Sequence, residues 1–148
     1  MNRSISKTKR GLSLIELVTV MAIVSIIAAI AWPQFEATRE RSRRTEGRTA
    51  ILLAQAYMEK CYSKFRDYDN TACKNLTPQL STSIGGNYNI VVTASTAETY
   101  TLEATPAAGG NQTGDDECAV LRISETGIKK ALRADATPND TACWAGNN

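Results

Sequence analysis

Residues 12–35, LSLIELVTVMAIVSIIAAIAWPQF, decide the fold of this chain. The part from Leu17 to Phe35 is nineteen residues long and carries no charge. At a helical rise of ~1.5 Å per residue, this part spans roughly the hydrocarbon core of a bilayer. The sequence therefore predicts a helix that can cross a membrane, with one carboxylate, Glu16, just inside its amino-terminal end.

Two ordinary explanations of this apolar run remain open. A secretory signal peptide is supported by four basic residues among the first ten and by the small-x-small triplet Ala29, Ile30, Ala31. Against it, the run is longer than the usual ~7–15 residues, and a charge at helix-centre depth costs about 3 kcal/mol. An uncleaved anchor explains the length of the run but leaves Glu16 unexplained.

The segment around Gly11, RGLSLIEL, resembles the processing site of type IV prepilins and the related pseudopilins. The resemblance implies that a prepilin peptidase cleaves after Gly11 and methylates the new amino terminus on Leu12, where the family usually has phenylalanine. The cut precedes the apolar run, so the mature chain keeps it. Glu16 then matches the family's glutamate, and Pro33 matches its helix-kinking proline.

The position of Glu16 has a physical explanation in such an assembly. A carboxylate in hydrocarbon either takes up a proton or finds a cation, and cleavage after Gly11 would create a positive amine on Leu12. If the amine of a neighbouring subunit approaches Glu16, the pair sets the axial register between identical helices. The alternative is that Glu16 stays at the cytoplasmic edge of the membrane, where its charge is tolerated.

The helix is expected to continue well past the apolar run. Strong helix formers follow Pro33, and the next proline is Pro78. We therefore predict a helix of about fifty residues from Leu12 to Tyr62, bent near Pro33 and amphipathic in its second half. Its expected apolar face has the three-to-four spacing of Ala50, Leu53, Tyr57 and Cys61, flanked by Ile51, Ala54 and Met58.

Residues 36–48 form a charged stretch with five basic and three acidic residues. The stretch fits a solvated helix with a Glu40–Arg44 pair, or a set of salt bridges between subunits of a helical assembly. Direct nucleic-acid binding is not predicted, because no aromatic residue is interleaved with these arginines. The formal charge of +2 also depends on the leader, since 13 basic residues face 15 acidic ones after residue 11.

From Asn87 the hydrophobic period changes to that of strands. Strands are predicted over 87–93, 99–105, 118–124 and 128–132. The residues expected on the buried side of the first two are Tyr88, Ile90 and Val92, then Tyr100, Leu102 and Ala104. The fold class is therefore α+β, a long helix packed by its carboxy-terminal half against an antiparallel sheet of about four strands, as in the type IV pilin fold.

The four cysteines predict disulfides, since none forms the C-x-x-C pair of a zinc site. Of the three pairings, Cys61 with Cys73 and Cys118 with Cys143 close the shorter loops, and we favour them. The second resembles the carboxy-terminal disulfide of type IV pilins, and the Cys118–Lys129 pattern with its terminal C-W resembles small PilE-type minor pilins. The acidic run 115–117 lacks the spaced ligands of a calcium site, so a solvated turn and no metal are expected.

These observations divide the chain into three parts. They are a leader (1–11), an apolar transmembrane and filament-core helix (12–35), and a globular head (36–148) made of a helix (36–62), a loop (63–86) and a β-meander with a disulfide-bounded end (87–148). The absence of histidine removes Ser/His/Asp and Cys/His catalytic arrangements, so no enzyme and no cofactor are expected.

The resemblance implies a structural pilin, of the minor kind by its tail, that polymerises through its amino-terminal helix. Its partners would be other pilin subunits, the prepilin peptidase and an inner-membrane assembly platform. The precursor would sit in the bacterial inner membrane with a cytoplasmic amino terminus and a periplasmic head, and then join an extracellular fibre that supports adhesion, twitching motility or DNA uptake. The alternatives are a type II secretion pseudopilin and a membrane-anchored periplasmic binding module.

Overall fold

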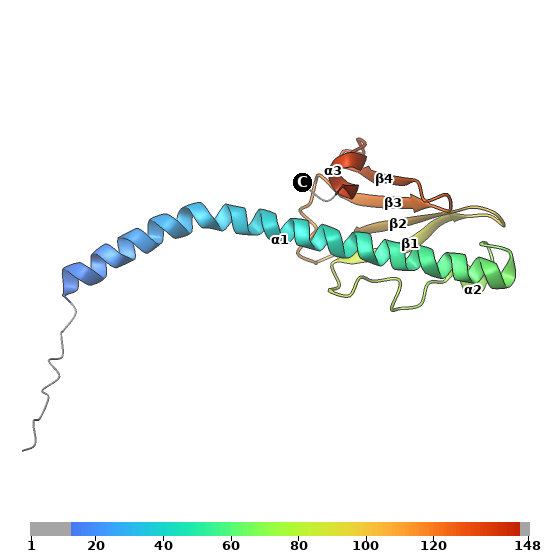
Figure 1. Ribbon diagram of the computed structural model, residues 1–148, viewed down its shortest axis with the longest axis horizontal. Coiled ribbons are helices and arrows are strands. Elements are labelled where there is room, and N and C mark those ends of the chain that lie inside the picture. The colour runs from blue at the N-terminus through green and yellow to red at the C-terminus, as the bar shows by residue number, and fades with distance from the viewer. Residues whose placement is uncertain (1–12, 146–148) are drawn as a thin grey trace, which may run out of the picture. The chain divides into compact units, whose positions relative to one another are not determined.

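The computed structural model describes residues 13–145 of the chain (Figure 1). The chain divides into two compact units between Thr38 and Arg39, close to the predicted boundary between helix and head. The elements in chain order are α1 (Leu14–Phe65), α2 (Thr71–Lys74), β1 (Tyr88–Ser95), β2 (Tyr100–Pro106), β3 (Val120–Ser124), β4 (Lys129–Leu132) and α3 (Asp140–Trp144).

The first unit contains the apolar part of α1. Every large apolar side chain in it is exposed, and an 18-residue window with a mean hydropathy of 2.6 makes α1 long and apolar enough to cross a membrane. Its hydroxyl groups bond to the helix itself, as when Thr19 donates to the Glu16 carbonyl at 2.9 Å and Ser25 to the Met21 carbonyl at 2.7 Å. These two hydroxyls are thereby satisfied without water, which suits a lipid or protein surrounding.

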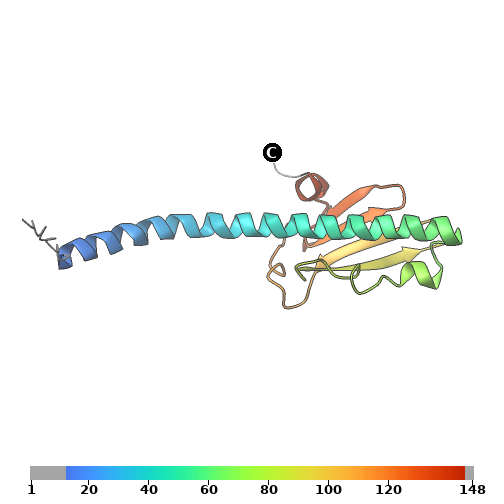
Figure 2. The ribbon, with the colours of Figure 1, turned by 60° about the horizontal axis from the view of Figure 1, so that its bottom comes forward.

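In the second unit, α1 lies across one face of a four-stranded sheet (Figure 2). The sheet order is β1-β2-β3-β4 and every neighbouring pair is antiparallel, so the predicted meander is confirmed. The strand residues expected to face inward do so, with Val92 only partly buried. The alternation of apolar and polar residues thus gave the correct buried face of β1 and β2.

The buried face of α1 differs by one row from the predicted one. Ala50, Ile51, Ala54, Met58 and Cys61 are buried, whereas Leu53 is 49% exposed and Tyr57 only partly covered. The sheet therefore packs on the row we expected to flank the contact. Gly47 marks its closest approach, because a Cβ there would lie 2.9 Å from the ring of Tyr88. That approach requires glycine.

Helix α1 ends one turn later than predicted, at Phe65. Arg66 takes a φ of 56° and its N–H donates to the Tyr62 carbonyl at 2.7 Å, which is a left-handed helix cap. Two short helices were not predicted. In the expected loop, Asn70 caps α2 by accepting from the Ala72 N–H at 3.0 Å. In the expected irregular tail, residues 140–144 form α3.

Candidate functional site

The residues predicted to act in processing and assembly belong to the amino-terminal end. Gly11 and Leu12 lie outside the described residues, so cleavage and methylation stay predictions. Glu16 lies in the first turn of α1 with an exposed side chain. Pro33 lies inside α1, which is helical on both sides of it, and the bend expected there stays a prediction.

Two disulfides tie the head together. Cys61 at the end of α1 is joined to Cys73 in α2, with a Cα separation of 5.6 Å. Cys118 before β3 is joined to Cys143 in α3, with a Cα separation of 5.7 Å. These are the pairs that close the shorter loops. Closing loops of this size contributes on the order of 3 kcal/mol by restricting the unfolded chain.

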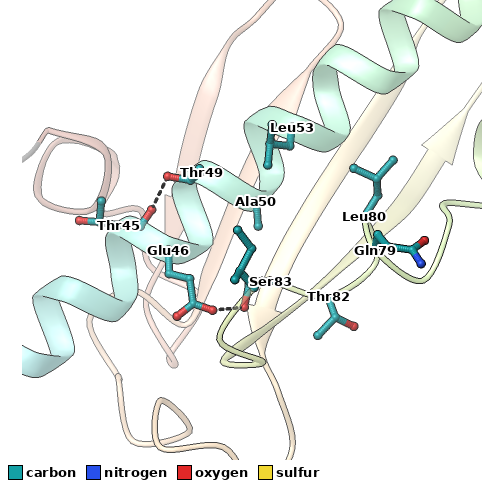
Figure 3. Close-up of a pocket in the computed structure, with 10 residues that line it drawn as sticks. Thr45, Glu46, Thr49, Ala50, Leu53, Gln79, Leu80, Thr82 and Ser83 are labelled. Carbon is teal, nitrogen blue, oxygen red and sulfur yellow. Dashed lines mark hydrogen bonds between the residues drawn. The ribbon is translucent and has the colours of Figure 1, made fainter.

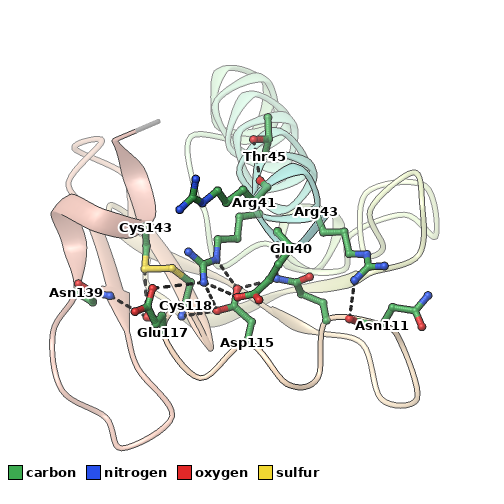
Figure 4. Close-up of polar contacts among 12 residues, drawn as sticks. Glu40, Arg41, Arg43, Thr45, Asn111, Asp115, Glu117, Cys118, Asn139 and Cys143 are labelled. Atoms are coloured by element: carbon green, nitrogen blue, oxygen red, sulfur yellow. Dashed lines mark hydrogen bonds and ion pairs between the residues drawn. A yellow bond between two sulfur atoms is a disulfide. The ribbon is translucent and has the colours of Figure 1, made fainter. Parts of the chain in front are cut away.

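Arg44, which is 7% exposed, is the centre of an ion-pair cluster. Its acidic partners Glu40, Asp115 and Glu117 are labelled in Figure 4. Its Nε and Nη2 donate to the two carboxylate oxygens of Asp115, each at 2.6 Å, and Nη2 also donates to Glu40 Oε1 at 2.6 Å. Glu117 Oε2 lies 3.6 Å from Nη2. The cluster fixes α1 to the segment before β3, directly beside Cys118, whose N–H donates to Asp115 at 3.1 Å.

The charges of this cluster determine its titration. Burial alone would raise the pKa of Asp115, but the hydrogen bonds and charge of Arg44 hold that pKa below its ordinary value. For Glu40 the balance is reversed, because burial and the nearby Asp115 raise its pKa. The hydrogen bond to Asp115 is the largest cause of the raised pKa of Arg44, which stays charged. Asp115 and Arg44 therefore form the ionised centre of the cluster.

Two expectations are corrected here. The acidic run was expected to be a solvated turn, and Asp116 and Glu117 are exposed, but Asp115 is only 3% exposed. The expected Glu40–Arg44 pair is present at 2.6 Å, but its Arg44 is only 7% exposed. A signal was present in the sequence, because Arg44 precedes Gly47 and Ile51 at three-to-four spacing and so lies on the buried row of α1. We gave the charge of the side chain more weight than its position.

Glu46 holds the loop before β1 against α1. Its carboxylate accepts hydrogen bonds from the hydroxyl of Ser83, from the Gly85 N–H at 2.7 Å and from the Asn87 side chain at 2.7 Å. Burial would raise the pKa of Glu46, but these bonds, led by the one from Ser83, lower it. Ser83 in turn accepts from the Tyr88 N–H at 3.0 Å, so the loop is tied to both α1 and β1.

A cluster of tyrosines joins the last turns of α1 to the sheet. The rings of Tyr62 and Tyr68 stack with centroids 4.3 Å apart, and Tyr68 meets Tyr100 edge-on at 4.7 Å. Both Tyr68 and Tyr100 donate to the carboxylate of Glu59, at 2.9 and 2.8 Å. Burial, aided by the bond to Glu59, raises the pKa of Tyr68 to about 12. The cluster fixes the end of α1, where a groove lies.

A shallow groove of about 400 Å³ lies at this end of α1. Its charged side chains are Lys60 and Lys64, and its aromatic ones are Tyr57 and Phe65. The Lys64 amine lies 4.9 Å from the centre of the Phe65 ring. Tyr57 donates to the Ala72 carbonyl at 2.7 Å, which holds α2 against the groove. Amines beside aromatic faces can bind an anionic polymer or a base.

Known structures share the fold. The crystal structure of the Neisseria meningitidis non-core minor pilin PilV matches with a TM-score of 0.55 and 22% identity, over 68% of this chain and 93% of PilV. The long apolar helix and the antiparallel meander are thus those of a type IV pilin, and the predicted fold class is confirmed.

Known sequences give the family. Residues 33–122 match the family described as "Type IV minor pilin ComP, DNA uptake sequence receptor", and residues 6–32 match the prokaryotic N-terminal methylation motif. The chain belongs to this type IV minor pilin family, which confirms the predicted resemblance and the expectation that it is not an enzyme.

A curated relative adds a partial match. The type IV major pilin protein PilA of Myxococcus xanthus (strain DK1622) is 39% identical over 64 residues, which are 41% of this chain and 29% of PilA. The chain thus spans less than a third of this relative's length. The methylation motif and the apolar helix fit a membrane-anchored precursor.

Proposed function

We propose that the chain is a minor subunit of a type IV pilus, cut by prepilin peptidase after Gly11, methylated on Leu12 and polymerised through its apolar helix. The observation that carries this proposal is the apolar part of α1, whose large side chains are all exposed. Such a surface requires lipid or other apolar helices around it. The methylation motif over residues 6–32 supports a cut in front of this helix.

The proposal also covers topology and partners. The leader stays in the cytoplasm, residues 12–35 hold the precursor in the inner membrane, and the head from residue 36 faces the periplasm. The assembly platform then moves the subunit into the fibre, where its apolar helix is buried against those of its neighbours. The fibre supports adhesion, twitching motility or DNA uptake.

Intact-mass analysis of the chain extracted from membranes tests this proposal. We expect the mass of residues 12–148 plus one methyl group. A Gly11→Val variant is the matched control and is expected to keep its leader, because the peptidase acts after glycine in this resemblance. A mature chain beginning at Trp32 would show a signal peptide, and an uncut Met1 would show a plain anchor. Either result would contradict the proposal.

We further propose DNA as a ligand of the head, because the matched family is described as a DNA uptake sequence receptor. This departs from our expectation of no direct nucleic-acid binding, which rested on the arginines of residues 36–48 and on the balance of charges after residue 11. The groove at the end of α1 fits better, since it combines Lys60 and Lys64 with two aromatic rings and has no acidic lining residue.

Fluorescence anisotropy with a labelled DNA duplex tests this ligand on the detergent-solubilised chain. Replacing both Lys60 and Lys64 with glutamine is expected to weaken binding and to reduce the slope of log K against log salt by about 1 for each lysine. Lys130→Gln, at an exposed position of β4, is the control and keeps the wild-type slope. An unchanged slope of log K against log salt in the double variant would mean that DNA does not bind at this groove.

A further inference from the structure

A second groove, of about 230 Å³, lies between α1 and the loop before β1 (Figure 3). Its apolar walls are Ala50 and Leu53 on the helix and Leu80 and Ile84 on the loop. Ile84 is 94% exposed and Leu53 is 49% exposed, so these two side chains leave apolar surface uncovered. The position of this loop is fixed by Glu46, and the groove is therefore held open.

The size and chemistry of the groove fit one aromatic side chain. Sites for small molecules usually enclose about 300–1,000 Å³, so this groove is small for a free ligand. Its rim carries Thr49, Gln79 and Thr82. Thr49 donates its hydroxyl hydrogen to the Thr45 carbonyl at 2.9 Å and keeps its oxygen free to accept. An apolar body with a single N–H donor, as in an indole, matches these walls and this rim.

Beside Glu46, which also lines the groove, the outer surface of α1 carries a band of uncharged side chains. Its exposed residues are Ser42, Thr45, Thr49, Leu52 and Ala56. Two arginines of the same helix point to other sides, Arg44 toward Asp115 and Arg43 toward the Asn111 carbonyl at 2.9 Å. A neutral band of small and aliphatic side chains permits the close approach of an apolar helix.

The chain itself carries a side chain of the required kind. Trp32 is 68% exposed at the end of the apolar part of α1. Within residues 13–145 its indole N–H has no hydrogen-bond acceptor, whereas the indole of Trp144 donates to the Lys130 carbonyl at 2.7 Å. Buried tryptophans usually donate this hydrogen, so Trp32 needs an acceptor once the helix is enclosed in a fibre.

We infer that the groove between α1 and the loop before β1 receives Trp32 of a second copy of this chain. The inference rests on the proposed polymerisation and specifies one contact within it. In a helical filament, identical chains are related by a rotation and a shift along the axis. The contact joins the first unit of one copy to the second unit of another. It is therefore a different contact from the pair of Glu16 with the Leu12 amine, which joins two amino-terminal ends.

Photocrosslinking in assembled fibres tests the contact. Benzoylphenylalanine replaces Ile84 in the full-length chain. Because Ile84 is exposed, this change does not disturb the core. Fibres are sheared from cells that produce unlabelled and isotope-labelled chains together, irradiated and digested. We expect mixed-label crosslinks to the peptide that contains Trp32. Trp32→Ala is expected to lower their yield about tenfold, the factor that corresponds to about 1.4 kcal/mol.

The controls separate this inference from the proposed function. Benzoylphenylalanine at Ile128, which is 58% exposed between β3 and β4, is expected to give no crosslink to that peptide. The amount of each variant in the fibres measures polymerisation independently. Variants that enter fibres but crosslink only within one chain, to a different pilin or to another peptide would overturn the inference and leave polymerisation intact. Absence of the wild-type chain from fibres would instead overturn the proposed function, and the inference with it.

Discussion

Replacing Arg44 with methionine is expected to lower the free energy of unfolding by about 3–5 kcal/mol, because it leaves a buried carboxylate without its partner. The side chain of Asp115 is fully buried, and that of Arg44 is 9% exposed. Glu40 and Glu117 are 38% and 62% exposed, so water can compensate for their loss of the cation. The cost therefore comes from Asp115.

Urea denaturation of the detergent-solubilised chain, followed by circular dichroism, measures this change. Arg41→Met removes an exposed arginine three residues earlier on α1 and is expected to stay within about 0.5 kcal/mol of wild type. The double change Arg44→Met with Asp115→Leu is expected to recover part of the loss, since it removes both charges. A loss below about 1 kcal/mol in Arg44→Met would show that the pair is solvated.

The pH dependence gives an independent measurement of the same pair. Because folding lowers the pKa of Asp115, its contribution is fully present above the unfolded value of about 3.9 and is lost as pH falls through the folded pKa. Glu40 acts in the opposite sense, since its raised pKa favours the folded state at acid pH. We expect the wild-type chain to lose stability on acidification below about pH 4, and Arg44→Met to lose much less.

The fold was predictable because its signals are local. The apolar run and the three-to-four spacing predicted α1, and the alternation from Tyr88 to Ala104 predicted two strands with the correct buried side. Spacing alone left two rows of α1 open for the contact with the sheet, since rows including Leu53 or Ile51 are both apolar. Gly47 was the missed signal, because a glycine among helix formers marks the closest approach of the Tyr88 ring.

The polar contacts of the head depend on residues that are distant in sequence. Arg44 and Asp115 are 71 residues apart, and Glu46 and Ser83 are 37 apart. No local pattern pairs such residues, so the charges of residues 36–48 fitted a solvated helix or salt bridges between subunits. The groove that we assign to Trp32 depends on the Glu46 contact in turn. Neither the Arg44–Asp115 cluster nor the groove could therefore be predicted from the sequence.

Replacing Glu16 with alanine is expected to reduce incorporation into fibres by tenfold or more and to leave membrane insertion intact. Glu16 is the only charged side chain in residues 12–35, and the hydroxyls of Thr19 and Ser25 in that segment bond to their own helix. Its loss makes the segment more apolar, which favours insertion. In the fibre, however, the amine of a neighbouring Leu12 would be left without a counter-charge in apolar surroundings, at a cost of several kcal/mol.

Quantitative immunoblots of sheared fibres and of membranes measure the two effects separately. Ser25→Ala is the matched control, because it removes a polar group from the same helix without removing a charge, and it is expected to assemble normally. Glu16→Gln separates charge from hydrogen bonding, since the amide can accept a bond from the Leu12 amine but cannot neutralise it. We expect Glu16→Gln to assemble poorly as well. Normal assembly of Glu16→Ala would mean that Glu16 stays at the membrane edge and that the axial register is set by other contacts, such as the seating of Trp32.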